Sequence, residues 1–296
     1  MTKTNKPPYF NKVFFKSSEV MAELPDNSVD LIITSPPYWD IKDYSKDGGH
    51  KYLKGEKKHS ESDESDMGNV SDYSDYIDKC LVIWKECYRV LKPNGKLCLN
   101  VPTVNHRKKK AYSISFDMRK SIFRHTHFQF FNLVVWYKKK RAEPFQKGSF
   151  PFPGDIWNWF GMTEDIIILV KPGPEPNPED WDEEIGKQSA LTRDEWYKII
   201  NPIWEIVPPQ SRTGGHSAVM SIEVVERLVK AYSFVGGLVL DPFTGSGTTL
   251  LGAKKLNRNW VGYELYPFYK KEIENTLGEK LDDSNDLKEG DNDLMF

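Results

Sequence analysis

An apolar run that ends in two prolines places the strongest local constraint on this chain. Residues 29–34 are mostly apolar or β-branched and lie between turn-forming residues, so they predict a short buried strand. Consecutive prolines fix the backbone φ angle, remove two amide donors and prevent a helix from following directly. The strand must therefore end in a stiff loop that carries one hydroxyl and two aromatic rings, in the order Ser35-Pro36-Pro37-Tyr38-Trp39.

Taken alone, this loop also fits an ordinary strand end, but a second loop changes the interpretation. Residues 241–249 read Asp-Pro-Phe-Thr-Gly-Ser-Gly-Thr-Thr, and they separate a predicted strand at 238–240 from a predicted helix at 248–256. Glycines there permit a tight turn and let a ligand approach the backbone. After about twenty residues Glu264 follows on the next predicted strand, where nucleotide-binding folds place an acid that accepts hydrogen bonds from ribose hydroxyls.

Two common phosphate-binding loops do not fit this string. No Gly-Lys-Ser/Thr follows the glycines, which argues against a P-loop, and the three-glycine spacing of dinucleotide sites is missing.

Strands and helices alternate along the chain, which predicts a doubly wound, mainly parallel α/β sheet. The predicted strands are 12–16, 29–34, 96–101, 130–137, 165–170, 238–240 and 260–265. The predicted helices are 18–24, 76–91, 115–124, 192–200, 221–233 and 248–256. In such sheets ligands bind outside the carboxyl ends of the strands, which is where both loops lie.

Composition sets the remaining limits. With 296 residues the chain fits one large α/β domain, and its net charge of -2 hides basic clusters at 107–110 and 138–141. Cys80, Cys87 and Cys98 match neither a disulfide framework nor a zinc pattern, so no metal is expected. No apolar run is long enough to span a bilayer and the start is no signal peptide, so the expected compartment is the cytoplasm.

Residues 40–72 are polar and directly follow the Pro-Pro loop. They fit a mobile lid over a site or, equally, a solvated insertion.

The two loops together resemble the catalytic and S-adenosylmethionine motifs of DNA amino-methyltransferases, over most of residues 12–277. Because the catalytic motif comes first, the order resembles the circularly permuted β-group of that family. The resemblance implies a Rossmann-like, seven-stranded methyltransferase sheet with its last strand antiparallel. It also implies a division of the chain into four regions. The first is a catalytic half at 1–137 with the mobile loop 40–72, and the second is a target-recognition region at 138–215 that includes strand 165–170. A cofactor half at 216–280 and an acidic tail at 281–296 follow.

The resemblance also implies S-adenosyl-L-methionine as the cofactor. The loop after residue 240 would wrap the methionine part, Phe243 would lie against the adenine and Glu264 would hold the ribose. A further cofactor motif at 216–220 departs from the usual proline-rich form, and the family's Gly-Asp near the N-terminus is replaced by Ser17-Ser18. The cofactor residues implied are Asp241, Pro242, Phe243, Thr244, Gly245, Ser246, Gly247, Thr248, Glu264 and His216.

An exocyclic amine is a poor nucleophile because its lone pair is delocalised into the base. Ser35 Oγ and the Pro36 carbonyl oxygen would accept hydrogen bonds from its two N–H groups. Pro36 and Pro37 would fix the distance between these two acceptors. Such orientation supplies about 7–11 kcal/mol of a barrier. Tyr38 would stack on a base flipped out of the duplex. Trp39 fits either a second stacking face or a core residue, and the core is favoured. A cytosine C5 mechanism needs a cysteine after a proline, and none is present.

Serine at position 35, in place of aspartate, accompanies N4-cytosine methylation in this family. The expected substrate is therefore double-stranded DNA, methylated at cytosine N4 by a monomer or homodimer, with a restriction endonuclease of the same site as partner. The expected DNA contacts are Lys138, Lys139, Lys140, Arg141 and Arg212. An N6-adenine enzyme and a catalytically inactive nucleic-acid-binding module remain the alternatives.

Overall fold

A computed structural model describes residues 6–39, 67, 70, 72–107, 110–139, 162–174, 182–209 and 220–281. Its strands are β1 (Lys12–Phe14), β2 (Val29–Thr34), β3 (Leu91–Pro102), β4 (Asn105–Arg107), β5 (Lys110–Tyr112), β6 (Gln129–Lys138), β7 (Thr163–Val170), β8 (Ile203–Ile206), β9 (Leu238–Asp241) and β10 (Asn259–Tyr263). Eight of them form one sheet in the order β1-β10-β9-β2-β3-β7-β6-β8, and β4 and β5 form a separate hairpin. The proposed lid falls almost entirely outside the described residues, as does the acidic tail from residue 282 onward.

All seven predicted strands are present and the mainly parallel sheet is confirmed, with two differences. The short edge strand β8 is an eighth member that pairs parallel to β6. The antiparallel strand is β7, which lies between β3 and β6, whereas the last strand of the chain, β10, is parallel to β9.

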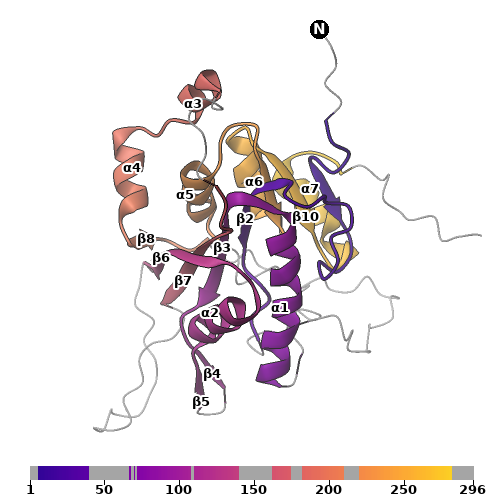
Figure 1. Ribbon diagram of the computed structural model, residues 1–296, viewed down its shortest axis with the longest axis vertical. Helices are drawn as coiled ribbons and strands as arrows, with labels where there is room; N and C mark the ends of the chain where they lie inside the picture. The colour runs from indigo at the N-terminus through magenta and orange to yellow at the C-terminus, as the bar shows by residue number, and fades with distance from the viewer. Residues whose placement is uncertain are drawn as a thin grey trace, which may run out of the picture.

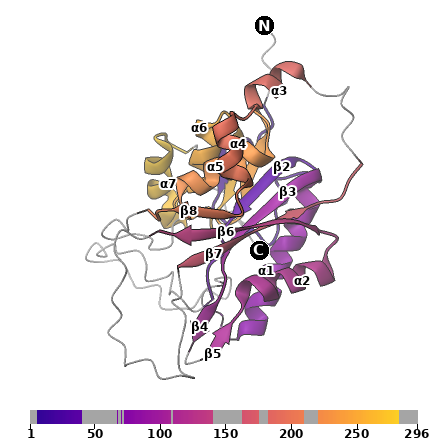
Figure 2. The same ribbon diagram turned by 90° about the vertical axis from the view of Figure 1, so that its left-hand side faces the viewer.

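Helices cover both faces of the sheet, as Figures 1 and 2 show. They are α1 (Tyr73–Val90), α2 (Ile114–His125), α3 (Glu183–Ser189), α4 (Arg193–Ile200), α5 (Ile222–Tyr232), α6 (Thr248–Lys255), the 3-10 turn η3 (Pro267–Tyr269) and α7 (Lys270–Leu277). One apolar core lies between the sheet and α1 and α2, and a second lies between the opposite face and α5, α6 and α7. The α/β class and its double winding are therefore as expected.

Helix α1 follows the sequence pattern closely. Asp72 caps its first turn by accepting hydrogen bonds from the amides of Ser74 and Asp75. Its buried face includes Tyr76, Trp84 and two of the three cysteines. All three cysteines are free and buried, and burial raises their thiol pKa values, that of Cys80 to about 12.

The predicted helix at 18–24 is wrong: the segment forms turns whose backbone is bound by side chains of α1. The Arg89 guanidinium donates to the carbonyls of Met21 and Leu24, at 3.0 Å each. Glu86 accepts the Met21 amide at 3.0 Å. Both Met21 and Leu24 are buried, so tertiary contacts hold this segment as turns.

The topology brings two distant loops to one place. Strand β2 pairs parallel with β9, with Leu31 opposite Val239 and Ile32 opposite Leu240. Because parallel strands end at the same edge, the loops that follow β2 and β9 leave the sheet side by side.

No helix in the described ranges is long and apolar enough to cross a membrane.

The contact between α5 and α6 generates a test of packing. A Cβ at Gly252 would overlap Val225 Cγ1, whereas a Cβ at Gly186 in α3 would meet nothing within 4 Å. We expect Gly252→Ala to lower the free energy of unfolding by about 1–3 kcal/mol through overpacking. Gly186→Ala, the matched control, should cost nothing and gain up to about 1 kcal/mol of helix stability. Urea unfolding measures both, and equal effects at the two positions would contradict this packing.

Candidate functional site

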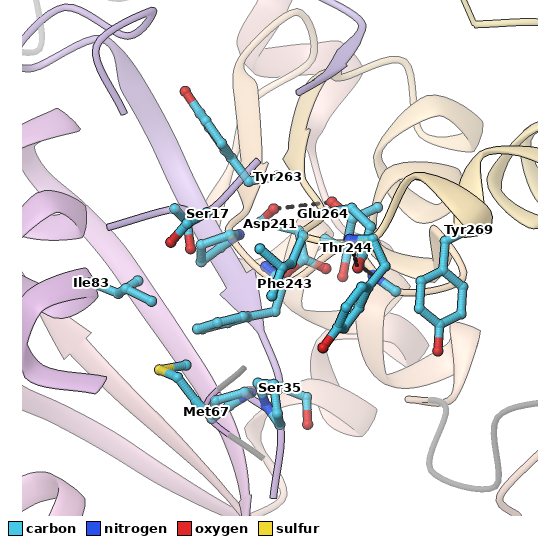
Figure 3. A pocket seen from close by; sticks show the side chains of 18 of the residues that line it. Ser17, Ser35, Met67, Ile83, Asp241, Phe243, Thr244, Tyr263, Glu264 and Tyr269 are labelled. Carbon is cyan, nitrogen blue, oxygen red and sulfur yellow. Dashed lines mark hydrogen bonds between the residues drawn. The ribbon is translucent and has the colours of Figure 1, made fainter. Parts of the chain in front are cut away.

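The two loops line one open cavity at the carboxyl edge of the sheet (Figure 3). It encloses about 1070 Å³, a volume that includes the space at its open mouth. Among the residues predicted from sequence, those that line it are Ser35, Pro36, Pro37, Tyr38, Asp241, Pro242, Phe243, Thr244, Gly245, Ser246, Thr248 and Glu264. The structure thus joins the expected catalytic loop and the expected cofactor loop in one site.

The glycine loop has the backbone shape that its sequence predicts. Gly245 and Gly247 have φ angles of 51° and 85°, in the left-handed region that side chains disfavour. The Gly247 amide closes a turn onto the Thr244 carbonyl at 2.9 Å, and Gly247 caps α6. Gly247 shapes the loop without lining the cavity.

Glu264 ties this loop to the end of β10. One carboxylate oxygen accepts the Gly245 amide at 2.8 Å, and the other accepts the Tyr266 amide at 3.0 Å. Each carboxylate oxygen has a second lone pair, so the group can also accept a hydrogen bond from a ligand hydroxyl.

Asp241 connects the two loops through its side chain. Its Oδ1 accepts the Thr34 hydroxyl at 2.7 Å and the Phe243 amide at 3.0 Å. Burial raises the pKa of this carboxyl, and the hydrogen bonds from Thr34, Thr249 and Phe243 act in the opposite direction. The last residue of β2 is thereby fixed to the last residue of β9.

The loop at residues 35–39, which follows β2, is held from two sides. Ser35 Oγ donates to the Tyr38 hydroxyl at 3.0 Å, and the same hydroxyl accepts from Asn100 Nδ2 at 3.4 Å. The Tyr76 hydroxyl of α1 donates to the Pro37 carbonyl at 3.0 Å. Because Ser35 gives its hydrogen to Tyr38, its lone pairs are left to accept hydrogen bonds from a ligand.

Trp39 is a core residue, as expected. Its side chain is buried, its indole nitrogen donates to the Val70 carbonyl at 2.8 Å, and its ring packs against Tyr73 and Tyr112.

The cavity wall includes residues that the sequence analysis did not assign. Phe243 lies among Ile83, Met67 and Ser35 in Figure 3, with its ring edge-on to Trp84 at 6.0 Å between centroids. The further lining residues are Lys16, Ser17, Ser18, Glu19, Met220, Thr249, Tyr263, Leu265, Tyr266 and Tyr269. Four of these had a sequence signal: Ser17 and Ser18 through their place in the family pattern, Met220 as the end of the 216–220 motif, and Thr249 as the end of the 241–249 string.

The residues predicted to contact DNA lie in different environments. The Lys138 ammonium forms an ion pair with the buried carboxylate of Glu164 and lies 5.0 Å from the centre of the Trp136 ring. Lys139 is exposed, at 3.4 Å from Glu205. Lys140, Arg141 and Arg212 lie outside the described residues, as does the predicted cofactor residue His216. In the described ranges no group of three or more His, Cys, Asp or Glu could hold a metal ion.

Comparisons with known proteins agree with this geometry. Residues 29–275 match the family model of DNA methylases of the N6/N4 type. The type II methyltransferase M.MjaI of Methanocaldococcus jannaschii is 29% identical, over 91% of this chain and 92% of the relative. The type II methyltransferase M.MthZI of Methanothermobacter thermautotrophicus is 27% identical, over 94% of this chain and 79% of the relative.

Solved structures share the fold. The protein TTHA0409 of Thermus thermophilus superimposes with a TM-score of 0.69 and 26% identity, over 92% of this chain and 100% of the other. Its complex with S-adenosyl-L-methionine superimposes with a TM-score of 0.65 and 27% identity, over 92% of this chain and 98% of the other. The Rossmann-like methyltransferase fold is thus shared with a protein that binds that ligand.

The bond between Thr34 and Asp241 generates a pH-dependent prediction. Thr34→Val removes a buried donor to the carboxylate and should lower the free energy of unfolding by about 1–3 kcal/mol near neutral pH. The folded pKa of Asp241 is raised, so its stabilising contribution is present below its unfolded pKa of about 3.9 and is lost as pH rises through the folded pKa. The substitution raises that pKa further, so its cost should grow with pH.

Urea unfolding between about pH 3 and about pH 8 measures this cost on both sides of the ordinary aspartate pKa of about 3.9. Thr126→Val is the matched control, because it removes a 2.8 Å bond to the non-titrating Ile122 carbonyl. If the loss in free energy of unfolding varied with pH in the same way for both variants, the bond from Thr34 to a titrating Asp241 carboxylate would be contradicted.

Proposed function

We propose, from the premise that this chain belongs to the DNA methylase family of N6/N4 methyltransferases, that it methylates the N4 amine of cytosine at specific sites in double-stranded DNA. The observation that carries the proposal is that Ser35 lines the same cavity as the loop at 241–248. A hydroxyl there can accept an N–H of an amine while the methyl donor occupies the same cavity.

The cofactor is S-adenosyl-L-methionine, which supplies an electrophilic methyl group, and the Thermus relative binds it. Glu264 is placed to accept hydrogen bonds from the ribose hydroxyls, and Phe243 offers an apolar face for the adenine. The loop at 241–248 would enclose the methionine part. Ser17 and Ser18 line the cavity where the family carries Gly-Asp, so their hydroxyls are the groups available to the adenine amine.

The chain's own contribution to the chemistry is orientation. Ser35 Oγ and the Pro36 carbonyl would accept hydrogen bonds from the two N–H groups of the amine, which pulls the nitrogen out of its planar, conjugated arrangement and turns its lone pair toward the methyl group. Two prolines and the bond from Tyr76 to the Pro37 carbonyl hold these acceptors in place. Fixed orientation is worth about 7–11 kcal/mol when the reacting atoms are held near contact.

The target base must leave the duplex to reach this loop. Unstacking costs a few kcal/mol, and stacking on an aromatic ring recovers about 1–3 kcal/mol per base. Tyr38 lines the cavity beside Ser35 and offers that ring.

The choice of cytosine rests on residue 35. A neutral hydroxyl avoids placing a carboxylate beside the electron-rich O2 and N3 edge of cytosine. The N6-adenine alternative belongs to the same family, and the product separates the two. The catalytically inactive alternative is disfavoured, because both loops are intact and share one cavity.

The surrounding regions extend the proposal. Residues 138–215 would recognise the target between a catalytic half at 1–137 and a cofactor half at 216–280. Strand β7 of that middle region is part of the central sheet, so recognition would fall to the segments on either side of it. The relatives named above are type II methyltransferases, which supports a restriction endonuclease of the same site as partner.

The product of the reaction provides the direct test. DNA from cells that express the protein should carry N4-methylcytosine at one sequence, and methylation-sensitive sequencing returns both the base and the site. Incubation of unmodified DNA with labelled S-adenosylmethionine, followed by digestion to nucleosides, identifies the product independently. N6-methyladenine as the sole product would reject cytosine, and no labelled nucleoside would reject the enzyme.

Variants of the catalytic loop test the assigned roles. Ser35→Ala removes an acceptor for the amine and should lower kcat roughly 100-fold or more, the range typical of a group acting on a proton in the transition state. Tyr38→Ala should weaken capture of the flipped base. Both should bind the cofactor normally. Ser28→Ala, which loses an exposed bond to the Pro25 carbonyl, is the matched control with wild-type activity. Wild-type rates for Ser35→Ala would remove that residue from the mechanism.

A further inference from the structure

A buried chain of polar groups leads from the catalytic loop into the sheet. Tyr38, Asn100 and Glu164 are exposed by only 6%, 1% and 4%, and the Lys138 side chain by 17%. Asn100 Nδ2 donates to Glu164 Oε2 at 2.5 Å and to the Tyr38 hydroxyl at 3.4 Å. The Lys138 ammonium binds the other Glu164 oxygen. Asn100, Glu164 and Lys138 are called the buried relay below.

Three neighbouring strands place these side chains on one face. In the β3–β7 pairing Pro102 lies opposite Glu164 and Asn100 lies opposite Ile166. In the β6–β7 pairing Trp136 lies opposite Glu164, and Lys138 follows two residues later. Side chains alternate along a strand, so all of them point toward the same side of the sheet. Both pairings must be in register for the relay to form.

The orientation of Asn100 is determined by its neighbour. A carboxylate can only accept, so Glu164 requires the amide nitrogen of Asn100 and excludes the opposite rotamer, which would set two oxygens together. Among the residues that the structure describes, Asn100 Oδ1 has no hydrogen-bond partner. The amide nitrogen therefore points toward both Glu164 and Tyr38.

Stability alone does not account for this arrangement. A buried polar atom without a partner costs about 1–3 kcal/mol. Replacing a buried ion pair with apolar side chains of similar volume is often neutral or stabilising. The sheet around the relay is otherwise apolar, with Val134, Ile166 and Ile168 in its core. The relay ends on the hydroxyl that receives the Ser35 hydrogen, which points to a role in the site.

We propose that Asn100 is a positioning residue for methyl transfer, held by the Glu164–Lys138 pair and acting through the Tyr38 hydroxyl. By donating to that oxygen Asn100 fixes the plane of the Tyr38 ring, on which the base stacks. The Tyr38 oxygen in turn keeps the Ser35 hydrogen, so that the Ser35 lone pairs face the amine. The inference rests on the proposed function and adds three residues to it.

The relay also gives Lys138 a different role from the phosphate contact expected from sequence. A phosphate-binding lysine needs an accessible ammonium. Here the ammonium is paired with a buried carboxylate, whereas the side chain of Lys139 is 63% exposed. Lys138 thus acts as an internal counter-charge, and Lys139 is the better phosphate contact.

A double-mutant cycle tests whether Asn100 acts through Tyr38. Asn100→Leu has a similar volume but cannot donate, and Tyr38→Phe keeps the ring but loses the oxygen. Each should lower kcat for DNA methylation about 10-fold, and the double variant should lie within about 2-fold of Tyr38→Phe, because both remove one interaction. Additive losses, or a wild-type rate for Asn100→Leu, would overturn the proposal.

Cofactor binding shows whether the variants are merely misfolded. Dissociation constants for S-adenosylmethionine, measured by calorimetry, should stay within about 2-fold of wild type, since the relay lies behind the catalytic loop. If Asn100→Leu does not fold, Asn100→Ser, which is too short to reach either partner, takes its place in the cycle. Glu226→Gln, which weakens a surface pair with Lys255, is a control variant expected to be fully active. A wild-type protein that methylates no DNA would instead reject the proposed function.

Salt dependence separates the two lysines. Removing one phosphate contact reduces the slope of log affinity against log salt by about 0.9. Lys139→Gln should show this reduction. Lys138→Met should lower kcat and leave the salt slope unchanged. The double variant Lys138→Met with Glu164→Gln should recover part of the lost kcat, because it leaves no buried charge unpaired. A reduced slope for Lys138→Met would contradict its place in the relay.

Discussion

The parallel pairing of β2 with β9 is the interaction on which the rest of this molecule depends. It sets two loops, more than 200 residues apart in sequence, at one edge of one sheet. The buried bond from Thr34 to Asp241 fixes the ends of the two strands to each other, so that the loops cannot shift independently. The Ser35 hydroxyl and the loop at 241–248 share a cavity because of this pairing.

Three buried carboxylates organise the site, and each is stabilised by specific donors. Asp241 accepts from Thr34 and Phe243, Glu264 accepts from two backbone amides, and Glu164 is paired with Lys138 and Asn100. Burying a charge is costly unless it is paired or hydrogen-bonded, so each of these groups also specifies the geometry around it. Asp241 and Glu264 hold the glycine loop in this way, and Glu164 is linked through Asn100 to the Tyr38 hydroxyl beside Ser35.

Rigidity and access are divided between different parts of the site. The Pro-Pro loop is fixed by its own rings, by Tyr76 and by the bonds at the Tyr38 hydroxyl. The cavity itself remains open, with Phe243, Met67 and Ile83 as an apolar wall. A cofactor can therefore enter a preformed site, and the groups proposed to orient the amine need not rearrange.

The sequence by itself determined the local features: strands marked by apolar runs, the stiff loop at Ser35, the turn at Gly245 and Gly247, and the acid at Glu264. Each depends on residues close together in the chain, so composition and spacing were sufficient to predict them. The edge strand β8, the turns at 18–24 and the buried relay were decided only by tertiary structure. Asn100 and Glu164 are 64 residues apart, and Glu86 binds the Met21 amide across 65. Such contacts depend on strand register and helix packing, which local pattern does not encode.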